Sequence, residues 1–309
     1  MGGIGKTTVA TALFHKIKYE FDGYCFLENV RESSGRNGQG LPNLRNMLLS
    51  QVMQEQQHLS MYISRAFLKN RLSGKKVLIV LYDIDDIEQL ENLVGGRNWF
   101  GVGSRVVITT RNRQLLTDQV DEVYGYAKDQ LSDEDGLLLF SRYAFRTSQP
   151  PEDYLELSRK VMHYASGIPL ALKLLGSYLR KKDERTWKSA LARLERFSDD
   201  EIYGKVLELS FEGLNSKEKD ILLDVACFFK GEDVELASLV WEACGFLSHD
   251  AISVLSDKCL ISMQNNNSRL WMHDLIQEMW KAIVRKESVE PGDFKNSMHN
   301  LDLSETKEV

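Results

Sequence analysis

The sequence predicts an α/β domain with a parallel sheet, followed by a helical bundle and a winged-helix subdomain. Three observations lead to this prediction. Short apolar runs alternate with helix patterns over residues 1–128, helix patterns alone follow over 129–198, and helices with a short hairpin fill 199–288. Residues 289–309 are mostly polar and contain Pro291 and Gly292, so we expect a loose, linker-like tail there.

Strands of the first domain are expected at Tyr24–Leu27, Val77–Leu81 and Val106–Thr109, with a short further strand at Val123–Tyr124. The run Val77–Leu81 is too apolar for an exposed strand and fits a parallel strand that is buried on both faces. Between these runs, apolar residues recur at the spacing of a helix, for example Leu44, Leu48 and Val52.

Helix signals dominate the rest of the chain. Ser132–Asp135 resembles a capping box, and Pro169 suits the first turn of a later helix. The apolar residues of Ile221–Phe229 are expected to line one helix. Short strands at Leu260–Met263 and Arg269–Met272 then predict a hairpin, and a hairpin after helices is typical of a winged helix.

Composition narrows the classes of protein. Asp and Glu (45) outnumber Lys and Arg (39), and the net charge of -6 argues against nucleic acid as the main partner. The four cysteines are scattered without a C-x-x-C pair, which favours a reduced compartment, the cytoplasm or the nucleus. The sequence shows no secretory signal, and its apolar runs fall short of the ~18 residues of a membrane helix.

A glycine-rich stretch at the start of the chain predicts a phosphate-binding loop. It matches the back half of the P-loop pattern G-x-x-x-x-G-K-[ST], and the alternative is a plain glycine turn before a helix. Glycines allow backbone N–H groups to approach phosphate oxygens, and the helix expected from Thr8 onward favours an anion at its start. Lys6 would contact the β and γ phosphates, and the Thr7 hydroxyl would bind Mg²⁺. The nucleotide-binding residues expected here are Gly2, Gly3, Ile4, Gly5, Lys6, Thr7 and Thr8.

Two polar residues follow the apolar strands. Asp83 is the candidate for the acid that holds Mg²⁺ or its water, and it is the catalytic candidate; the alternative is a turn aspartate. Tyr82 stands where a first acidic residue is expected. Arg111 lies at the ligand edge of a parallel sheet and could sense a γ-phosphate, or it could be a surface arginine.

From spacing alone, His273 is an ordinary residue at the start of a helix.

Five blocks occur in a specific order: Met1–Thr8, Phe26–Glu32, Gly103–Arg111, Gly167–Leu172 and Met272–Asp274. With these blocks the chain resembles the nucleotide-binding NB-ARC region of plant disease-resistance proteins. Two further features, Asp86 and the segment Leu223–Phe229, are similar to the TIR-type branch of that family.

The resemblance implies an α/β nucleotide domain and two ARC subdomains, one helical and one winged-helix. It implies a switch in which ADP holds the protein closed, and exchange for ATP with Mg²⁺ lets the winged-helix part rotate. The protein then associates with itself or with related receptors, and it is at most a slow ATPase. It also implies that Arg111 senses the γ-phosphate, that Pro169 and its neighbour Leu170 pack at the adenosine end, and that His273 contacts the ADP β-phosphate.

Three positions depart from the family pattern. Tyr82 replaces an acid that helps to hold Mg²⁺, and a phenol cannot act as a carboxylate near neutral pH. Trp280 stands where glycine is usual, so we expect it to disturb the packing of the last helix. The first P-loop glycine and its strand are missing, and this absence should split the sheet beside the strand that ends at Arg111. We expect Met1 to be an internal methionine of the family's Gly-Met-Gly-Gly motif.

Two other functions stay open at this point. The chain could be a nucleotide-free adaptor that docks onto full-length receptors, which Tyr82 and the missing strand favour. It could also be an ordinary hydrolase or transporter-type ATPase, against which stands the lack of a clear catalytic glutamate after Asp83.

Overall fold

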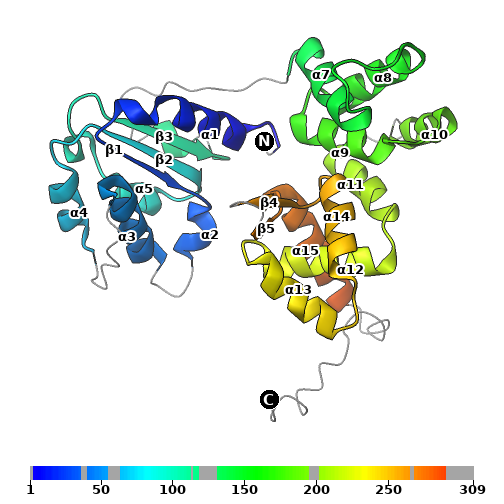
Figure 1. Ribbon diagram of the computed structural model, residues 1–309. Coiled ribbons are helices and arrows are strands. Elements are labelled where there is room, and N and C mark those ends of the chain that lie inside the picture. Colours follow the sequence, from blue (N-terminus) through cyan, green and yellow to red (C-terminus); the bar gives the residue numbers. More distant parts are fainter. Residues whose placement is uncertain are drawn as a thin grey trace, which may run out of the picture. The chain divides into compact units, whose positions relative to one another are not determined.

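The computed structural model describes residues 3–35, 40–54, 63–112, 114–117, 131–194, 202–264 and 268–289. The chain divides into two compact units, Met1–Lys128 and Asp129–Val309 (Figure 1). The first unit is built on a parallel sheet, and the second consists of helices and a two-stranded hairpin.

The sheet of the first unit contains β1 (Gly23–Leu27), β2 (Val77–Ile84) and β3 (Arg105–Thr110) in the order β1-β2-β3. All neighbouring strands are parallel, so their carboxyl ends lie at one edge of the sheet. Every residue of the central strand β2 is buried, because helices cover both faces of the sheet. The prediction of a doubly buried parallel strand is therefore confirmed.

Helices pack on the two faces as in a three-layer α/β fold (Figure 1). On one face, Ala10 and Phe14 of α1 (Lys6–Ile17) pack with Leu78 and Val80 of the central strand. The other face packs against α3 (Gly40–Met53), α4 (Arg65–Leu72) and α5 (Ile87–Leu93). The short helices of this unit are η1 (Lys18–Glu20), α2 (Val30–Ser34), η2 (Arg97–Trp99) and α6 (Gln114–Thr117).

Strand β3 is an edge strand within the described sheet. Its Val106 side chain is 36% exposed, in contrast to the buried side chains of the central strand. The three described strands form one continuous sheet, and the further strand expected at Val123–Tyr124 lies outside the described residues.

The second unit begins with a helical bundle whose core holds Phe140 and Trp187, with the Phe145 ring stacked on Trp187. Ser132 caps the first helix by accepting a hydrogen bond from the Asp135 N–H, as the sequence predicts. The helices are α7 (Asp133–Ala144), η3 (Glu152–Tyr154), α8 (Leu155–Ala165), α9 (Pro169–Leu179) and α10 (Glu184–Leu194).

The winged-helix part follows in the same unit. Its helices are α11 (Ile202–Glu212), α12 (Ser216–Asp224), η5 (Val225–Phe229), α13 (Val234–Ala243), α14 (Ser248–Asp257) and α15 (Asp274–Val289). Strands β4 (Ser262–Gln264) and β5 (Arg269–Trp271) form the antiparallel hairpin. The residues between them and the tail from residue 290 onward lie outside the described part of the chain.

Two expectations about apolar side chains are wrong. The helix expected over Ile221–Phe229 changes at Val225 to a π-helical turn, whose wider repeat leaves Phe228 74% exposed instead of on the apolar face. Trp280 does not disturb α15. Its ring is fully buried and packs against Phe211 of α11, with 4.4 Å between the ring centroids.

Candidate functional site

The phosphate-binding loop adopts a conformation that requires its glycines. Gly3 and Gly5 have φ angles of 71° and 88°, a left-handed region that other residues rarely adopt. Gly5 caps α1, so the helix begins at Lys6, two residues earlier than expected. Lys6 and Thr7 therefore lie in the first helical turn, where free N–H groups and the helix dipole favour an anion.

Of the other expected loop residues, Thr8 lies on α1, Ile4 lies in the bend before the helix, and Gly2 is outside the described residues.

Lys6 is electrostatically linked to the carboxyl edge of the sheet. Burial lowers the pKa of its ammonium, the positive charge of Arg111 lowers that pKa further, and the negative charge of Asp83 partly opposes both. The charge of Lys6 thus carries a desolvation cost. A bound phosphate would offset this cost by Coulomb attraction.

Asp83 lies at an irregular point of the central strand. The pairing of β2 with β3 shifts register between Leu81 and Ile84, and Asp83 has a φ angle of 60°. Its N–H donates to Oγ1 of Thr109 at 3.0 Å. Strained backbone and irregular strand pairing concentrate at functional positions, because they direct a side chain out of the regular pleat.

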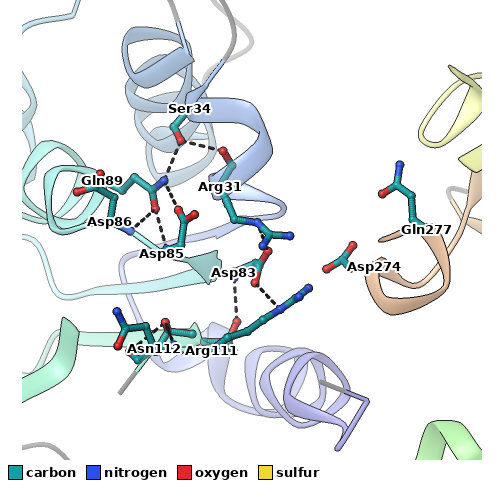
Figure 2. Close-up of polar contacts among 12 residues, drawn as sticks. Arg31, Ser34, Asp83, Asp85, Asp86, Gln89, Arg111, Asn112, Asp274 and Gln277 are labelled. Atoms are coloured by element: carbon teal, nitrogen blue, oxygen red, sulfur yellow. Dashed lines mark hydrogen bonds and ion pairs between the residues drawn. The ribbon is translucent and has the colours of Figure 1, made fainter. Parts of the chain in front are cut away.

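Two arginines pair with the Asp83 carboxylate, one on each oxygen (Figure 2). Arg31 Nε lies 3.1 Å from Oδ2, and Arg111 Nε lies 3.5 Å from Oδ1. The structure thus brings together the predicted residues Asp83 and Arg111. It adds Arg31, for which the sequence predicts no role. Its position after strand β1 was the available signal, because parallel strands end at the same edge of a sheet.

The other two acids of this turn serve the helix that follows. Asp86 caps α5 in a capping box with Gln89, whose Oε1 accepts from the Asp85 N–H. Nε2 of Gln89 donates to Asp85 Oδ1 at 2.7 Å and to Ser34 Oγ at 2.8 Å (Figure 2). Asp83 is therefore the acid of this turn that faces the arginines rather than the helix cap.

The donor set fits a phosphate better than it fits Mg²⁺. Thr7 and Asp83 are the expected metal ligands, but both Asp83 oxygens already lie beside guanidinium groups. Tyr82 is buried and supplies no carboxylate. Over the described ranges, no group of three or more His, Cys, Asp or Glu side chains is arranged to hold a metal ion.

The remaining predicted residues belong to the second unit. Pro169 occupies the first position of α9, and Leu170 beside it is buried. His273 directly precedes α15, and its Nδ1 accepts from the Leu275 N–H at 3.2 Å. That bond places the imidazole proton on Nε2, which can then donate to an oxygen. Contact of these residues with a nucleotide stays a prediction.

A glycine loop before a helix on a parallel sheet, an acid near the end of the central strand and a helical second unit define a P-loop NTPase with a C-terminal winged helix. The family models agree: "NB-ARC domain" matches residues 1–150, and "Disease resistance protein Roq1-like, winged-helix domain" matches residues 215–288. The chain therefore carries the NB-ARC and winged-helix domains of TIR-type plant disease resistance proteins, as its sequence motifs predicted.

Relatives match almost the whole chain. It is 44% identical to disease resistance protein RUN1 of Vitis rotundifolia over 98% of this chain and 23% of that protein. It is 38% identical to TMV resistance protein N of Nicotiana glutinosa over 95% of this chain and 25% of that protein. The chain thus spans about a quarter of the length of these curated relatives.

A solved structure supports the fold. The crystal structure of a STAND (signal transduction ATPase with numerous domains) protein with a tetratricopeptide-repeat sensor from Pyrococcus horikoshii matches with a TM-score of 0.52. The two chains are 17% identical, and the match covers 92% of this chain and 39% of the other. In the part of the chain described by the structure, no helix has the length and apolarity needed to cross a membrane.

Proposed function

We propose that this chain is an ADP/ATP-binding switch module of a plant immune receptor. The observation that supports this proposal is the convergence of Lys6, Asp83 and Arg111 beside the glycine loop, at the carboxyl edge of the sheet. The glycine loop would bind the phosphates through backbone N–H groups, and Lys6 would contact the β and γ phosphates.

The γ-phosphate adds negative charge where Arg111 now pairs with Asp83. Arg111 would then have two competing anionic partners, and ATP would draw it away from Asp83. This change of partner by Arg111 would occur with a triphosphate and not with a diphosphate, so it would distinguish the two ligands. A shift from 1:99 to 99:1 between two states requires about 5.5 kcal/mol of differential binding, which a desolvated charged site can supply.

The second unit would complete the switch. His273, with its proton on Nε2, would contact the β-phosphate of ADP, and Pro169 with Leu170 would pack at the adenosine end. Exchange for ATP would release His273 and let the winged-helix part rotate, after which copies of the receptor associate in the cytoplasm. Hydrolysis would be slow, because Tyr82 replaces the second acid and Asp83 is the remaining candidate to hold Mg²⁺.

The test measures nucleotide in the purified chain. Protein carrying Lys6→Ala is compared with wild type and with Lys16→Ala, which removes an exposed lysine from the same helix. Nucleotide released by heat is identified by chromatography, and circular dichroism checks folding. We expect ADP in wild type and Lys16→Ala, and its loss in folded Lys6→Ala.

Folded wild-type protein that contains no nucleotide and has no measurable affinity for added ADP would refute the switch. If ADP is present but Lys6→Ala retains it fully, the phosphate-binding role of the loop is wrong. Rapid turnover of Mg-ATP by the wild-type chain would instead indicate an ordinary ATPase.

A further inference from the structure

We propose that Arg31 and a divalent cation are alternative partners of Asp83, so that this site holds a nucleoside diphosphate without Mg²⁺. The proposal rests on the nucleotide-binding function above and assigns a positioning role to Arg31. Its basis is the pairing of Arg31 Nε with Asp83 Oδ2 at 3.1 Å (Figure 2).

Arg31 is held in place by its own segment. It lies on α2, which begins after Asn29 in a left-handed conformation with a φ angle of 51°. Oγ of Ser34 donates to the Arg31 carbonyl oxygen at 3.0 Å, and Nε2 of Gln89 donates to the same Oγ at 2.8 Å. The backbone that carries Arg31 is thus hydrogen-bonded to the cap of the helix that follows Asp83, which holds this segment beside the turn that contains the carboxylate.

Arg31 and a metal ion compete for the carboxylate, because two cations beside one carboxylate repel each other. Mg²⁺ binds oxygen ligands at about 2.0–2.1 Å in an octahedral shell, which is hard to complete around an oxygen that already lies beside a guanidinium. Each oxygen of Asp83 has an arginine beside it, so a metal would have to bind next to a guanidinium while both pairs persist. A doubly charged cation between two guanidinium groups would also be repelled by both.

The charges of the site favour a diphosphate without a metal. Lys6, Arg31 and Arg111 contribute three positive charges, and the Asp83 carboxylate contributes one negative charge. The net charge of two positives lies in a partly desolvated site, where it attracts phosphate more strongly than in water. In the diphosphate state Arg31 would thus neutralise Asp83, the task that a metal ion performs at other phosphate sites.

The test measures the release rate of a fluorescent ADP analogue, loaded by exchange, with Mg²⁺ or with EDTA present. Wild type is compared with Arg31→Gln and with Arg65→Gln, whose arginine forms an exposed ion pair with Glu91 in the same unit. For wild type and Arg65→Gln we expect rates in the two buffers that agree within about twofold. For Arg31→Gln we expect the analogue to be released in EDTA at least about tenfold faster than from wild type. Mg²⁺ should reverse most of this increase in rate.

Wild-type protein that releases the analogue about tenfold faster in EDTA than in Mg²⁺ would overturn the proposal. This measurement does not depend on the folding of any variant. Equal rates for Arg31→Gln in the two buffers would overturn it as well. In both cases the analogue still binds, so the proposed function survives. If no chain binds the analogue in either buffer, the proposed function fails and this proposal fails with it.

Discussion

Nζ of Lys230 donates to Oδ1 of Asp274 at 2.6 Å, and both side chains are almost completely buried. The same ammonium donates to Oε1 of Gln277 at 2.8 Å and lies 4.8 Å from the centroid of the Trp271 ring. Gln277 in turn donates to the carbonyl oxygen of Ala226 in the π-helical turn. This cluster joins the π-helical turn to the start of α15, next to His273.

Removing the lysine should leave a buried carboxylate without its main partner. We expect Lys230→Met to lower the free energy of unfolding of the chain by about 3–5 kcal/mol, measured by denaturant titration. The double variant Lys230→Met with Asp274→Asn should recover much of that loss. Lys160→Met is the control, because its ion pair with Glu156 is exposed and should contribute less than about 1 kcal/mol. If Lys230→Met and Lys160→Met lowered the free energy of unfolding equally, the buried pair would contribute no more than an exposed one, and the prediction would be wrong.

Trp280 should be a structural residue of the second unit. Trp280→Ala leaves a cavity beside Phe211, and we expect it to cost about 3–5 kcal/mol of stability. Trp280→Phe keeps the ring contact and removes an indole N–H that is buried without a hydrogen-bond partner among the described residues, so its cost should stay below about 1.5 kcal/mol. Thermal unfolding of the two variants separates these outcomes. Similar melting temperatures for Trp280→Ala and wild type would show that the ring does not fill the core.

Two helical glycines should respond in opposite ways to alanine. A Cβ at Gly176 of α9 would lie 2.8 Å from Cβ of Tyr143 and 3.0 Å from the carbonyl oxygen of Phe140, so α7 and α9 can approach closely only without it. We expect Gly176→Ala to destabilise the chain by about 1–3 kcal/mol.

A Cβ at Gly204 of α11 would meet no atom of the described residues within 4 Å. Gly204→Ala should therefore stabilise the chain by about 0.5–1 kcal/mol, because alanine favours the helix. Denaturant titration of both variants gives the sign of each change, and a loss for Gly204→Ala would show that the surrounding space is not open.

Lys182 should make stability depend on pH in the alkaline range. Burial, and then the positive charge of Lys258, lower the pKa of its ammonium to about 8. The unfolded chain has the ordinary value near 10.4, so between these values the native state binds fewer protons and stability rises as pH increases. Below pH 8 Lys182 is charged in both the native and the unfolded state, so the full cost of desolvating its ammonium lowers the free energy of unfolding.

Lys182→Gln removes this titration, so the free energy of unfolding should be higher at pH 7 and should rise less between pH 8 and 10. Lys181→Gln changes an exposed neighbour and serves as the control. Parallel pH profiles for wild type and Lys182→Gln would show that Lys182 is not the source of the slope.

The sequence predicted what depends on local spacing, including the strand runs, the glycine loop, the Ser132 cap and the hairpin. It did not place the start of α1, because the left-handed conformation of Gly5 ends the loop two residues earlier than the apolar spacing suggests. The pairing of Arg31 with Asp83 joins residues 52 positions apart through the β1-β2 register, and no motif reports that register. The place of Trp280 likewise depends on Phe211 of a separate helix.

Gln89 hydrogen-bonds both to the acidic turn after β2 and to the α2 helix that carries Arg31. These two segments are therefore coupled, and a backbone shift in one is transmitted to the other. A change of partner at Asp83 then requires rotation of the Arg31 side chain but no rearrangement of its helix. Arg31 is partly buried and ion-paired, so its rotation is slower than the picoseconds to nanoseconds of an exposed side chain, but movements of whole domains take microseconds to milliseconds. The local response to a new ligand at this site should thus be complete long before any rotation of a domain begins.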